Sequence, residues 1–301
     1  MLVLGIGGGG DVVGALAAAR LCESLGTTFA LGGVAWERFA VDPNPGPRSV
    51  DEILGAEPLG DDAVLAAPET RTIDGITFAE SGVAAHLGTA TALIDVTGGV
   101  AGAAHGIASV MDRLECDLLF GVDIGGDVLA RGEEEGLASP LCDAVMVAAM
   151  LSVGGDAGPL LAVVGAGCDG ELSSAQVLER VAALGRAGAW LGSWGVSPAI
   201  GAEIERAAER VPTEASLQVA RCTRGETGRV PIRNGRRHVD LGPVGSLTFV
   251  FDASAAAEEL PLVGAVAGTE SVEDARAELT ARGVRTELDY ERARAAEADS
   301  R

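Results

Sequence analysis

Short apolar runs alternate with stretches of helical periodicity over most of the chain. The intervening helical periodicity is clearest at 103–115, 142–153 and 173–188. Buried parallel strands joined by helices predict an α/β fold with a Rossmann-like, doubly wound, mostly parallel sheet. The runs that have the composition of buried strands are Leu2–Ile6, Thr28–Leu31, Ala92–Val96, Asp117–Val122 and Leu160–Val164.

The remaining segments carry weaker or different signals. Residues 42–90 contain DPNPGPRS and few periodic cues, so we expect a long excursion over the sheet. After a helical stretch at 199–224, the Asn234-Gly235 step predicts a hairpin, SLTFVFD at 246–252 predicts a strand, and 272–283 predicts a helix. We expect one domain over 1–301. It consists of a Rossmann-like core (1–225), a C-terminal αβ elaboration (226–290) and a charged end (291–301) that frays.

Charge narrows the range of partners. The net charge is −22, and all 22 basic residues are arginine. Such a surface repels nucleic acid and anionic membranes, so we expect neither as a partner. The absence of lysine rules out a Schiff base and a P-loop lysine. Many acids without lysine indicate a salt-adapted source, a halophilic archaeon.

The chain also gives no sign of a membrane or secreted protein. No apolar run is long enough to span a bilayer. The first predicted strand begins at residue 2, so we expect no signal peptide and a cytoplasmic location. The five cysteines form no CxxC pair, which argues against disulfides and a structural zinc site.

The first loop combines glycines with a carboxylate. Gly5, Gly7 and Gly10 match GxGxxG, a pattern that holds a pyrophosphate at a helix N-terminus. Asp11 follows directly and would lie close to any bound phosphate. The second strand reads ALGGV, with no acid before Glu37, so the ribose carboxylate of a dinucleotide site is missing. Asp11 either caps the helix or takes part in a site.

Glycines with polar or charged residues recur after almost every predicted strand. Ligands of open parallel sheets bind outside the carboxyl ends of the strands, so we expect these loops to converge. A further Gly-Gly-Asp at 154–156 follows a helix and is expected to be a connecting turn. The loops contain Asp123 with Gly125-Gly126-Asp127, Asp169 with Glu171, Thr97-Gly98-Gly99, and Arg38 with Arg48.

A carboxylate in a phosphate loop makes sense if a divalent cation lies between the two groups. Mg²⁺ prefers carboxylate oxygens and keeps phosphate oxygens as further ligands. We therefore predict Asp11, Asp123 and Asp127 as Mg²⁺ ligands and Asp123, Asp127 and Asp169 as catalytic residues. Without a metal, the same carboxylates would accept hydrogen bonds from a sugar or an amino group. The predicted ligand-binding residues are Gly7, Gly8, Gly9, Gly10, Arg38, Arg48, Thr97, Gly98, Gly99, Gly125 and Gly126.

Histidine and cysteine give weaker leads. His105 follows the 97–99 loop on a small-residue helix, where a structural histidine is commoner than a catalyst. Cys168 lies in a Gly-rich loop and has the position of a thiol nucleophile, but no histidine is adjacent to it in sequence. The sequence leaves open whether either residue takes part.

Four segments together resemble an archaeal family known as domain of unknown function 1152. They are GIGGGGDVVGA (5–15), WERFAVDPNPGPRS (36–49), GVDIGGDVL (121–129) and VPTEAS (211–216). The resemblance covers most of the chain and implies an α/β, Rossmann-like fold. It implies no reaction.

Three functions are compatible with these features. The leading hypothesis is an enzyme that acts on a small anionic, phosphorylated metabolite with Mg²⁺ assistance, by phosphoryl transfer, hydrolysis or lyase chemistry. The alternative is a non-catalytic sensor that binds a nucleotide or metabolite in the same crevice. The third is an NAD-dependent oxidoreductase, which the missing carboxylate disfavours. The sequence leaves a homo-oligomer open.

The acidic composition generates a first prediction. Repulsion among carboxylates outside the crevice weakens folding at low ionic strength, and salt screens it. The melting temperature should therefore rise steadily as KCl is added, measured by calorimetry at constant pH. A melting temperature indifferent to KCl would show that the charge is not a salt adaptation.

Overall fold

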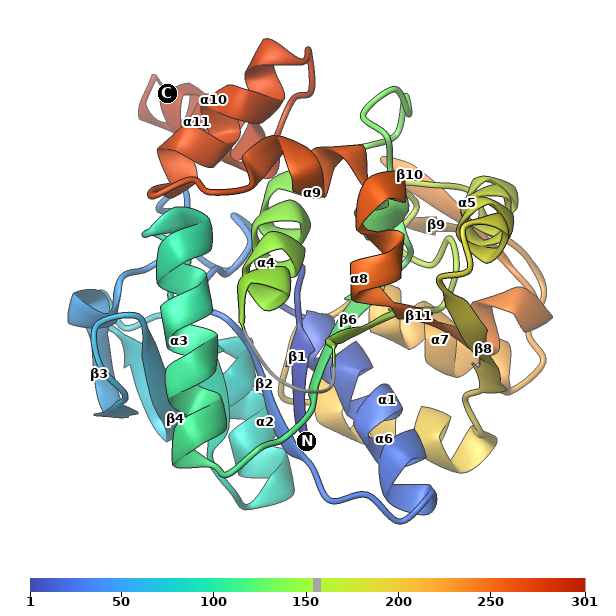
Figure 1. Cartoon of the computed structure of the whole chain (residues 1–301), viewed down its shortest axis with the longest axis horizontal. Coiled ribbons are helices and arrows are strands. Elements are labelled where there is room, and N and C mark those ends of the chain that lie inside the picture. Colours follow the sequence, from blue (N-terminus) through green and yellow to red (C-terminus); the bar gives the residue numbers. More distant parts are fainter. Residues whose placement is uncertain (154–157, 301) are drawn as a thin grey trace.

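A large mixed sheet forms the centre of the computed structural model, which describes residues 1–153 and 158–300 (Figure 1). Within these residues the sheet has nine strands in the order β3-β4-β5-β2-β1-β6-β7-β11-β8. Its five central strands are mutually parallel, as predicted. They are β1 (Leu2–Gly5), β2 (Ala30–Val34), β5 (Thr91–Ile94), β6 (Leu119–Ile124) and β7 (Leu160–Val164).

Both faces of this sheet are buried. Leu2, Leu4 and Ile6 belong to the hydrophobic core on one face, and Val3 belongs to the core on the other. Figure 1 shows α3 and α4 lying in front of the strands. The strands therefore read as continuous apolar runs, which is typical of parallel strands covered on both faces.

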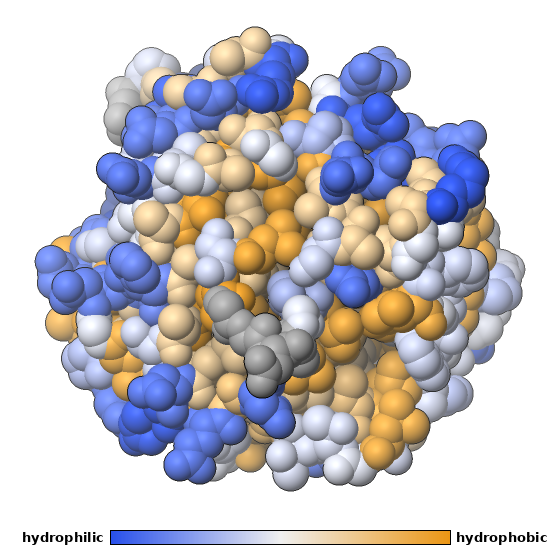
Figure 2. All heavy atoms as spheres, viewed as in Figure 1, coloured by the Kyte–Doolittle hydropathy of each residue, from blue (hydrophilic) through white to orange (hydrophobic). Residues whose placement is uncertain are grey.

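Helices supply the two covering layers. Figure 2 shows hydrophilic residues around the outline of one face, with hydrophobic residues between them. No helix among the described residues is long and apolar enough to cross a membrane. The first layer, on the face of Leu2 and Leu4, contains α3 (Gly99–Arg113), α4 (Pro140–Ser152), α5 (Ser174–Arg186), α8 (Ala253–Ala256), α9 (Pro261–Val266) and α10 (Val272–Ala281). The second layer, on the face of Val3, contains α1 (Asp11–Ser24), α2 (Ala79–Leu87), α6 (Pro198–Ala208) and α7 (Ala215–Thr223).

Residues 42–90 extend the sheet, so the prediction of an excursion over it was wrong. They form β3 (Ile53–Pro58) and β4 (Ala63–Thr72), which pair antiparallel, before α2 begins. β4 then pairs antiparallel with β5. Pairing with β4 makes β3 a strand. Most of β3 is exposed, so its side chains do not show the hydrophobic pattern of a buried strand.

The C-terminal segment completes the other end of the sheet. β11 (Leu247–Asp252) lies antiparallel between β7 and β8 (Trp190–Gly195). The predicted hairpin is β9 (Gly228–Ile232) and β10 (Arg237–Leu241), a separate two-stranded sheet. The predicted strand, hairpin and helix are all confirmed, and the strand belongs to the central sheet. The Gly-Gly-Asp at 154–156 lies outside the described residues.

The charged end does not fray where expected. It forms α11 (Glu287–Asp299), which starts at a capping box made by Thr286 and Asp289. Glu287 accepts hydrogen bonds from the backbone N–H groups of Leu141 and Cys142, at 3.0 and 2.7 Å. It thereby caps the N-terminus of α4 from a helix far away in sequence.

Two buried glutamates lie where β2 leads into the second helix layer. Glu37 accepts a hydrogen bond of 2.6 Å from the N–H of Ala79 at the start of α2. Neither carboxyl oxygen of Glu80 has a hydrogen-bond partner. Burial raises the pKa of Glu37 from 4.5 to about 7. Burial, with the charge of Glu37, raises the pKa of Glu80 well above its ordinary value.

These pKa values make stability depend on pH. A carboxyl with a raised pKa in the folded state favours folding while it is protonated, and that contribution is lost as pH rises through the folded value. We predict that Glu80→Gln makes the fall in melting temperature between about pH 5 and about pH 9 shallower than in wild type. The exposed Glu69→Gln is the matched control. Parallel melting curves for wild type and Glu80→Gln would contradict the assignment.

Candidate metal and anion site

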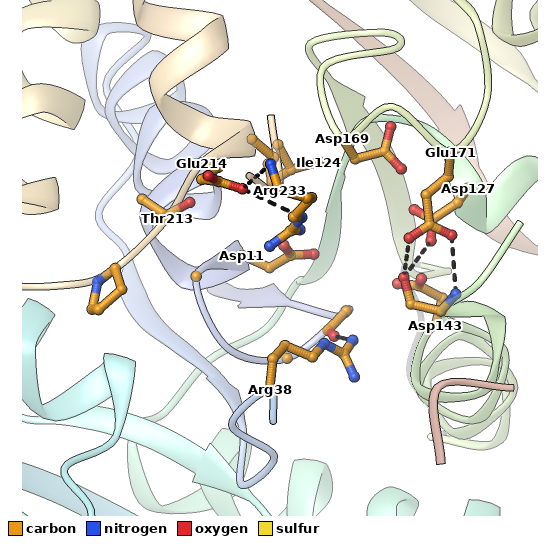
Figure 3. A pocket seen from close by; sticks show the side chains of 16 residues that line it. Asp11, Arg38, Ile124, Asp127, Asp143, Asp169, Glu171, Thr213, Glu214 and Arg233 are labelled. Atoms are coloured by element: carbon orange, nitrogen blue, oxygen red, sulfur yellow. Dashed lines mark hydrogen bonds and ion pairs between the residues drawn. The ribbon is translucent and has the colours of Figure 1, made fainter. Parts of the chain in front are cut away.

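The site lies at the carboxyl ends of β1, β6 and β7. The chain passes from β1 through β2 to β5 on one side and from β6 to β7 on the other, so the strand order reverses between β1 and β6. Crevices form at such switch points. The pocket there is lined by Gly7, Gly8, Gly10, Asp11, Arg38, Ile124, Asp127, Ser139, Asp143, Asp169, Glu171, Pro212, Thr213, Glu214, Ala215 and Arg233 (Figure 3).

Asp11, Asp123 and Asp143 form the first carboxylate group. Asp11 is the first residue of α1, Asp123 lies near the end of β6, and Asp143 lies in the first turn of α4. One oxygen from each of the three lies within 4.8 Å of the others. Asp123 Oδ2 and Asp143 Oδ1 are buried and have no hydrogen-bond partner.

Asp127, Asp169 and Glu171 form the second carboxylate group, with the same spacing. Glu171 is held tightly: its Oε1 accepts from Ser139 Oγ at 2.6 Å and from Arg237 Nη1 at 2.8 Å. By contrast, both carboxyl oxygens of Asp169 are buried without a partner. Figure 3 shows Asp127 and Glu171 on the side of the pocket opposite Asp11.

The shared burial perturbs these acids strongly. Burial, with the charge of Asp123, raises the pKa of Asp11 to about 8. Burial also raises the pKa of Asp123 to about 7 and the pKa of Asp169 well above its ordinary value. For Glu171, burial is outweighed by Arg237 and the Ser139 hydrogen bond, so its pKa is lowered. Burial therefore favours the protonated form of these acids, and a cation bound to their oxygens would replace those protons.

Glycines let the carboxylates lie against the loops. A Cβ on Gly7 would stand 2.4 Å from Asp11 Oδ2, and a Cβ on Gly125 would stand 2.2 Å from Asp169 Cγ. Gly125 also has a φ of +119°, in the region that favours glycine. The Gly-Gly-Asp turns thus make room for acids.

Arginines bring positive charge to the same pocket. The Arg38 guanidinium donates to the carbonyl oxygen of Gly7 and lies 3.7 Å from Glu287. Its Nη1 is buried and has no hydrogen-bond partner. Arg233 lies on the hairpin turn, 3.6 Å from Glu214. The pocket therefore combines carboxylate oxygens without hydrogen-bond partners with a guanidinium whose Nη1 has only a longer ion pair, to Glu287.

The structure brings together most of the residues predicted from β1, β6 and β7. Gly7, Gly8, Gly10, Asp11, Arg38, Asp127 and Asp169 line the pocket. Asp123 lies against Asp11 in the first carboxylate group. Gly9, Gly125 and Gly126 lie behind the lining: Gly9 N–H donates to Trp36 at 3.0 Å, and the other two lie against Asp169 and Val177.

Arg48 and the 97–99 loop do not line the pocket. Arg48 is buried in ion pairs with Asp42 and Glu52, at 2.7 and 3.0 Å. Thr97 donates to Asp95, and Gly99 packs against Ser271. Thr97 follows β5, which lies on the far side of β2 from β1, and Arg48 lies in the segment that leads away from β2. Both share the edge of the sheet with the pocket, but neither reaches the switch point. The expectation that the 97–99 loop lies in the main crevice was wrong.

Several residues of the site have no counterpart in the strand-end pattern. Asp143 lies on a helix, yet it is the single charge in CDAVMVAAMLSV, and an acid on a helix that is otherwise apolar all round is a usable signal. Arg233 and Arg237 belong to the hairpin, where sequence alone predicts solvent-exposed side chains. His105 is 80% exposed and Cys168 is buried beside Cys222. Neither lines the pocket.

Fold and site together define an α/β protein of Rossmann-like architecture with a carboxylate-rich pocket at its switch point. The family model for a protein of unknown function (DUF1152) matches residues 2–295, and the chain belongs to this family. Comparison with curated proteins gave no match, and comparison with solved structures gave none.

The close approach of Gly7 and Asp11 gives a prediction. Gly7→Ala should push the Asp11 carboxylate away from Asp143, because the added Cβ would overlap Asp11 Oδ2. We expect the affinity for Mn²⁺, used in place of Mg²⁺ and measured by calorimetry, to fall about tenfold or more. Gly264→Ala is the control, since a Cβ there meets no atom within 4 Å. Equal Mn²⁺ affinity in Gly7→Ala and wild type would remove Asp11 from the site.

Proposed function

We propose that the protein is a Mg²⁺-dependent enzyme that hydrolyses or transfers the phosphoryl group of a small anionic metabolite. One observation carries this proposal: oxygens of Asp123, Asp143 and Asp169 without hydrogen-bond partners lie in one buried site with Arg38, whose Nη1 has no hydrogen-bond partner and lies 3.7 Å from Glu287. Carboxylates alone would suit a cation, and a guanidinium alone would suit an anion. A metal–phosphate pair uses both.

Each group has a place in this proposal. Asp11, Asp123 and Asp143 hold the cation, which supplies Lewis-acid polarisation of a phosphoryl oxygen. Asp127 belongs to the other carboxylate group, so the predicted ligand set of Asp11, Asp123 and Asp127 changes by one residue. Arg38 and Arg233 bind the anion and hold its charge in place. With no lysine in the chain, arginine has to provide this clamp.

The geometry supports an NAD-dependent reaction less well. Glu37 is the acid that follows β2, where a dinucleotide fold places the carboxylate that binds ribose. It is buried and accepts a hydrogen bond from the N–H of Ala79, at the start of α2. Its carboxylate therefore serves the fold. A non-catalytic sensor would use the same pocket and is distinguished by the absence of turnover.

We predict that inorganic phosphate, used as a probe in calorimetry, binds wild type only when Mg²⁺ is present. Asp123→Asn should abolish this Mg²⁺-dependent binding, because the amide removes a charged ligand with little change in shape. Arg38→Gln should weaken phosphate binding about tenfold to hundredfold while Mg²⁺ still binds. The exposed Asp112→Asn is the control for charge removal.

Turnover is tested with the same variants. Phosphate release from a panel of small phosphorylated metabolites should require Mg²⁺ and should be lost in Asp123→Asn. Phosphate that binds equally well without Mg²⁺, and in Asp123→Asn, would show an anion pocket without a metal. Mg²⁺-dependent binding without any turnover would support the sensor.

A further inference from the structure

We propose that the pocket holds a second divalent cation, bound by Asp127, Asp169 and Glu171 next to the first. This inference rests on the proposed function for the identity of the pocket and deepens it. The second carboxylate group has its own ligand set, its own supporting residues and its own unpaired atoms. Together with the phosphoryl chemistry of the proposed function, a two-cation site suits in-line displacement at a phosphorus atom.

The three carboxyl groups come from two loops and meet in the pocket. Asp127 begins the turn after β6, and Asp169 and Glu171 belong to the loop after β7. They are 5%, 5% and 7% exposed, and one oxygen from each lies within 4.8 Å of the others. Opposite oxygens on one Mg²⁺ or Mn²⁺ lie about 4.2 Å apart, twice a bond of about 2.1 Å. Only one pair of the three can take opposite positions, and neighbouring oxygens lie about 3 Å apart, so a cation bound between them would draw the oxygens closer together.

The unpartnered carboxyl group of Asp169 points to a ligand. Both of its oxygens are buried in the pocket wall without a donor. A buried carboxyl group without partners is costly, and native structures rarely leave one so. The nearest arginine on this side, Arg237, is bound through Nη1 to Glu171. A cation therefore supplies what no protein donor supplies.

Glu171 is built as an anchored ligand. Its Oε2 accepts from the N–H groups of Ala138 and Ser139 at 2.6 and 3.0 Å. Its Oε1 accepts from Ser139 Oγ, which lies 3.2 Å from Asp127 Oδ2. Ser139 thus lies between the carboxylates of Asp127 and Glu171 and fixes their orientation, as second-shell donors do at metal sites.

Charge balance favours two cations over one. The two groups contain six carboxyl groups, and Arg237 neutralises Glu171. Two divalent cations neutralise four of the remaining five charges. A single cation leaves three carboxylates to Arg38 and Arg233, which are already shared with Glu287 and Glu214, in a pocket that must also accept an anion. With two cations the pocket tolerates a phosphoryl group beside Arg38.

The two groups also share a border. Asp123 belongs to the first group and Asp127 to the second, and the two lie four residues apart, at the end of β6 and at the start of the turn that follows it. Cations about 3.5–4 Å apart hold both the attacking and the leaving oxygen in phosphoryl transfer. The inferred substrate class is accordingly a phosphate ester or anhydride.

Mn²⁺ is the probe for this inference. Equilibrium dialysis of the full chain with Mn²⁺ should give two ions bound per chain, and electron paramagnetic resonance should show that they are spin-coupled. Asp169→Asn should reduce the number to one and give an uncoupled six-line spectrum, while the Asp112→Asn control keeps two coupled ions. Circular dichroism checks that Asp169→Asn is folded; if it is not, the count and coupling in wild type decide.

Each outcome separates this inference from the proposed function. One Mn²⁺ in wild type, or two without coupling, overturns the second site and leaves the Mg²⁺-dependent enzyme standing. Two ions retained in Asp169→Asn overturn the ligand assignment. No bound Mn²⁺ overturns both proposals. Two coupled ions in a protein that releases no phosphate from any phosphorylated metabolite overturn the proposed function and support the second site.

Discussion

The structure depends on confining mutually repelling carboxyl groups to one buried place. Six of them converge at the ends of β1, β6 and β7, where burial raises the pKa of most of them. The parallel strands β1, β6 and β7 are neighbours in the sheet, so their loops meet at the switch point between β1 and β6. The apolar core on both faces of the sheet keeps those strands in register. Packing thus supports a site whose own electrostatics oppose folding.

The far end of the chain helps to hold the site in shape. Glu287 on α11 caps α4, which carries Asp143, and also lies beside Arg38. Glu291 accepts hydrogen bonds from Trp36 Nε1 at 3.1 Å and from the N–H of Gly46 at 2.9 Å. One C-terminal helix therefore contacts both the helix that carries Asp143 and the guanidinium of Arg38. That segment is part of the structural support of the pocket, although its charged sequence resembles a solvated tail.

The fold and the site are predictable from the sequence where local pattern and topology agree. The central strands are apolar runs buried on both faces, and the loops that carry Asp11, Asp127 and Asp169 follow them directly. The sequence does not predict elements that form only through strand pairing: β3 is mostly exposed and is a strand because β4 pairs with it. All strand ends look equivalent in the sequence, so Arg48 and Thr97 were among the predicted ligand-binding residues. Strand order distinguishes these ends, and strand order is not local information.

The glycine-rich loop shows why a motif does not by itself identify a ligand. Glycines after a first strand commonly let backbone amides approach a phosphate. Here a Cβ at Gly7 or Gly125 would instead collide with the carboxyl group of Asp11 or Asp169. The same absence of a side chain thus makes room for a carboxyl group of the protein in place of a ligand's phosphate, and carboxylate oxygens are ligands for a cation. A phosphate can still enter such a loop, provided that a cation lies between it and the acid.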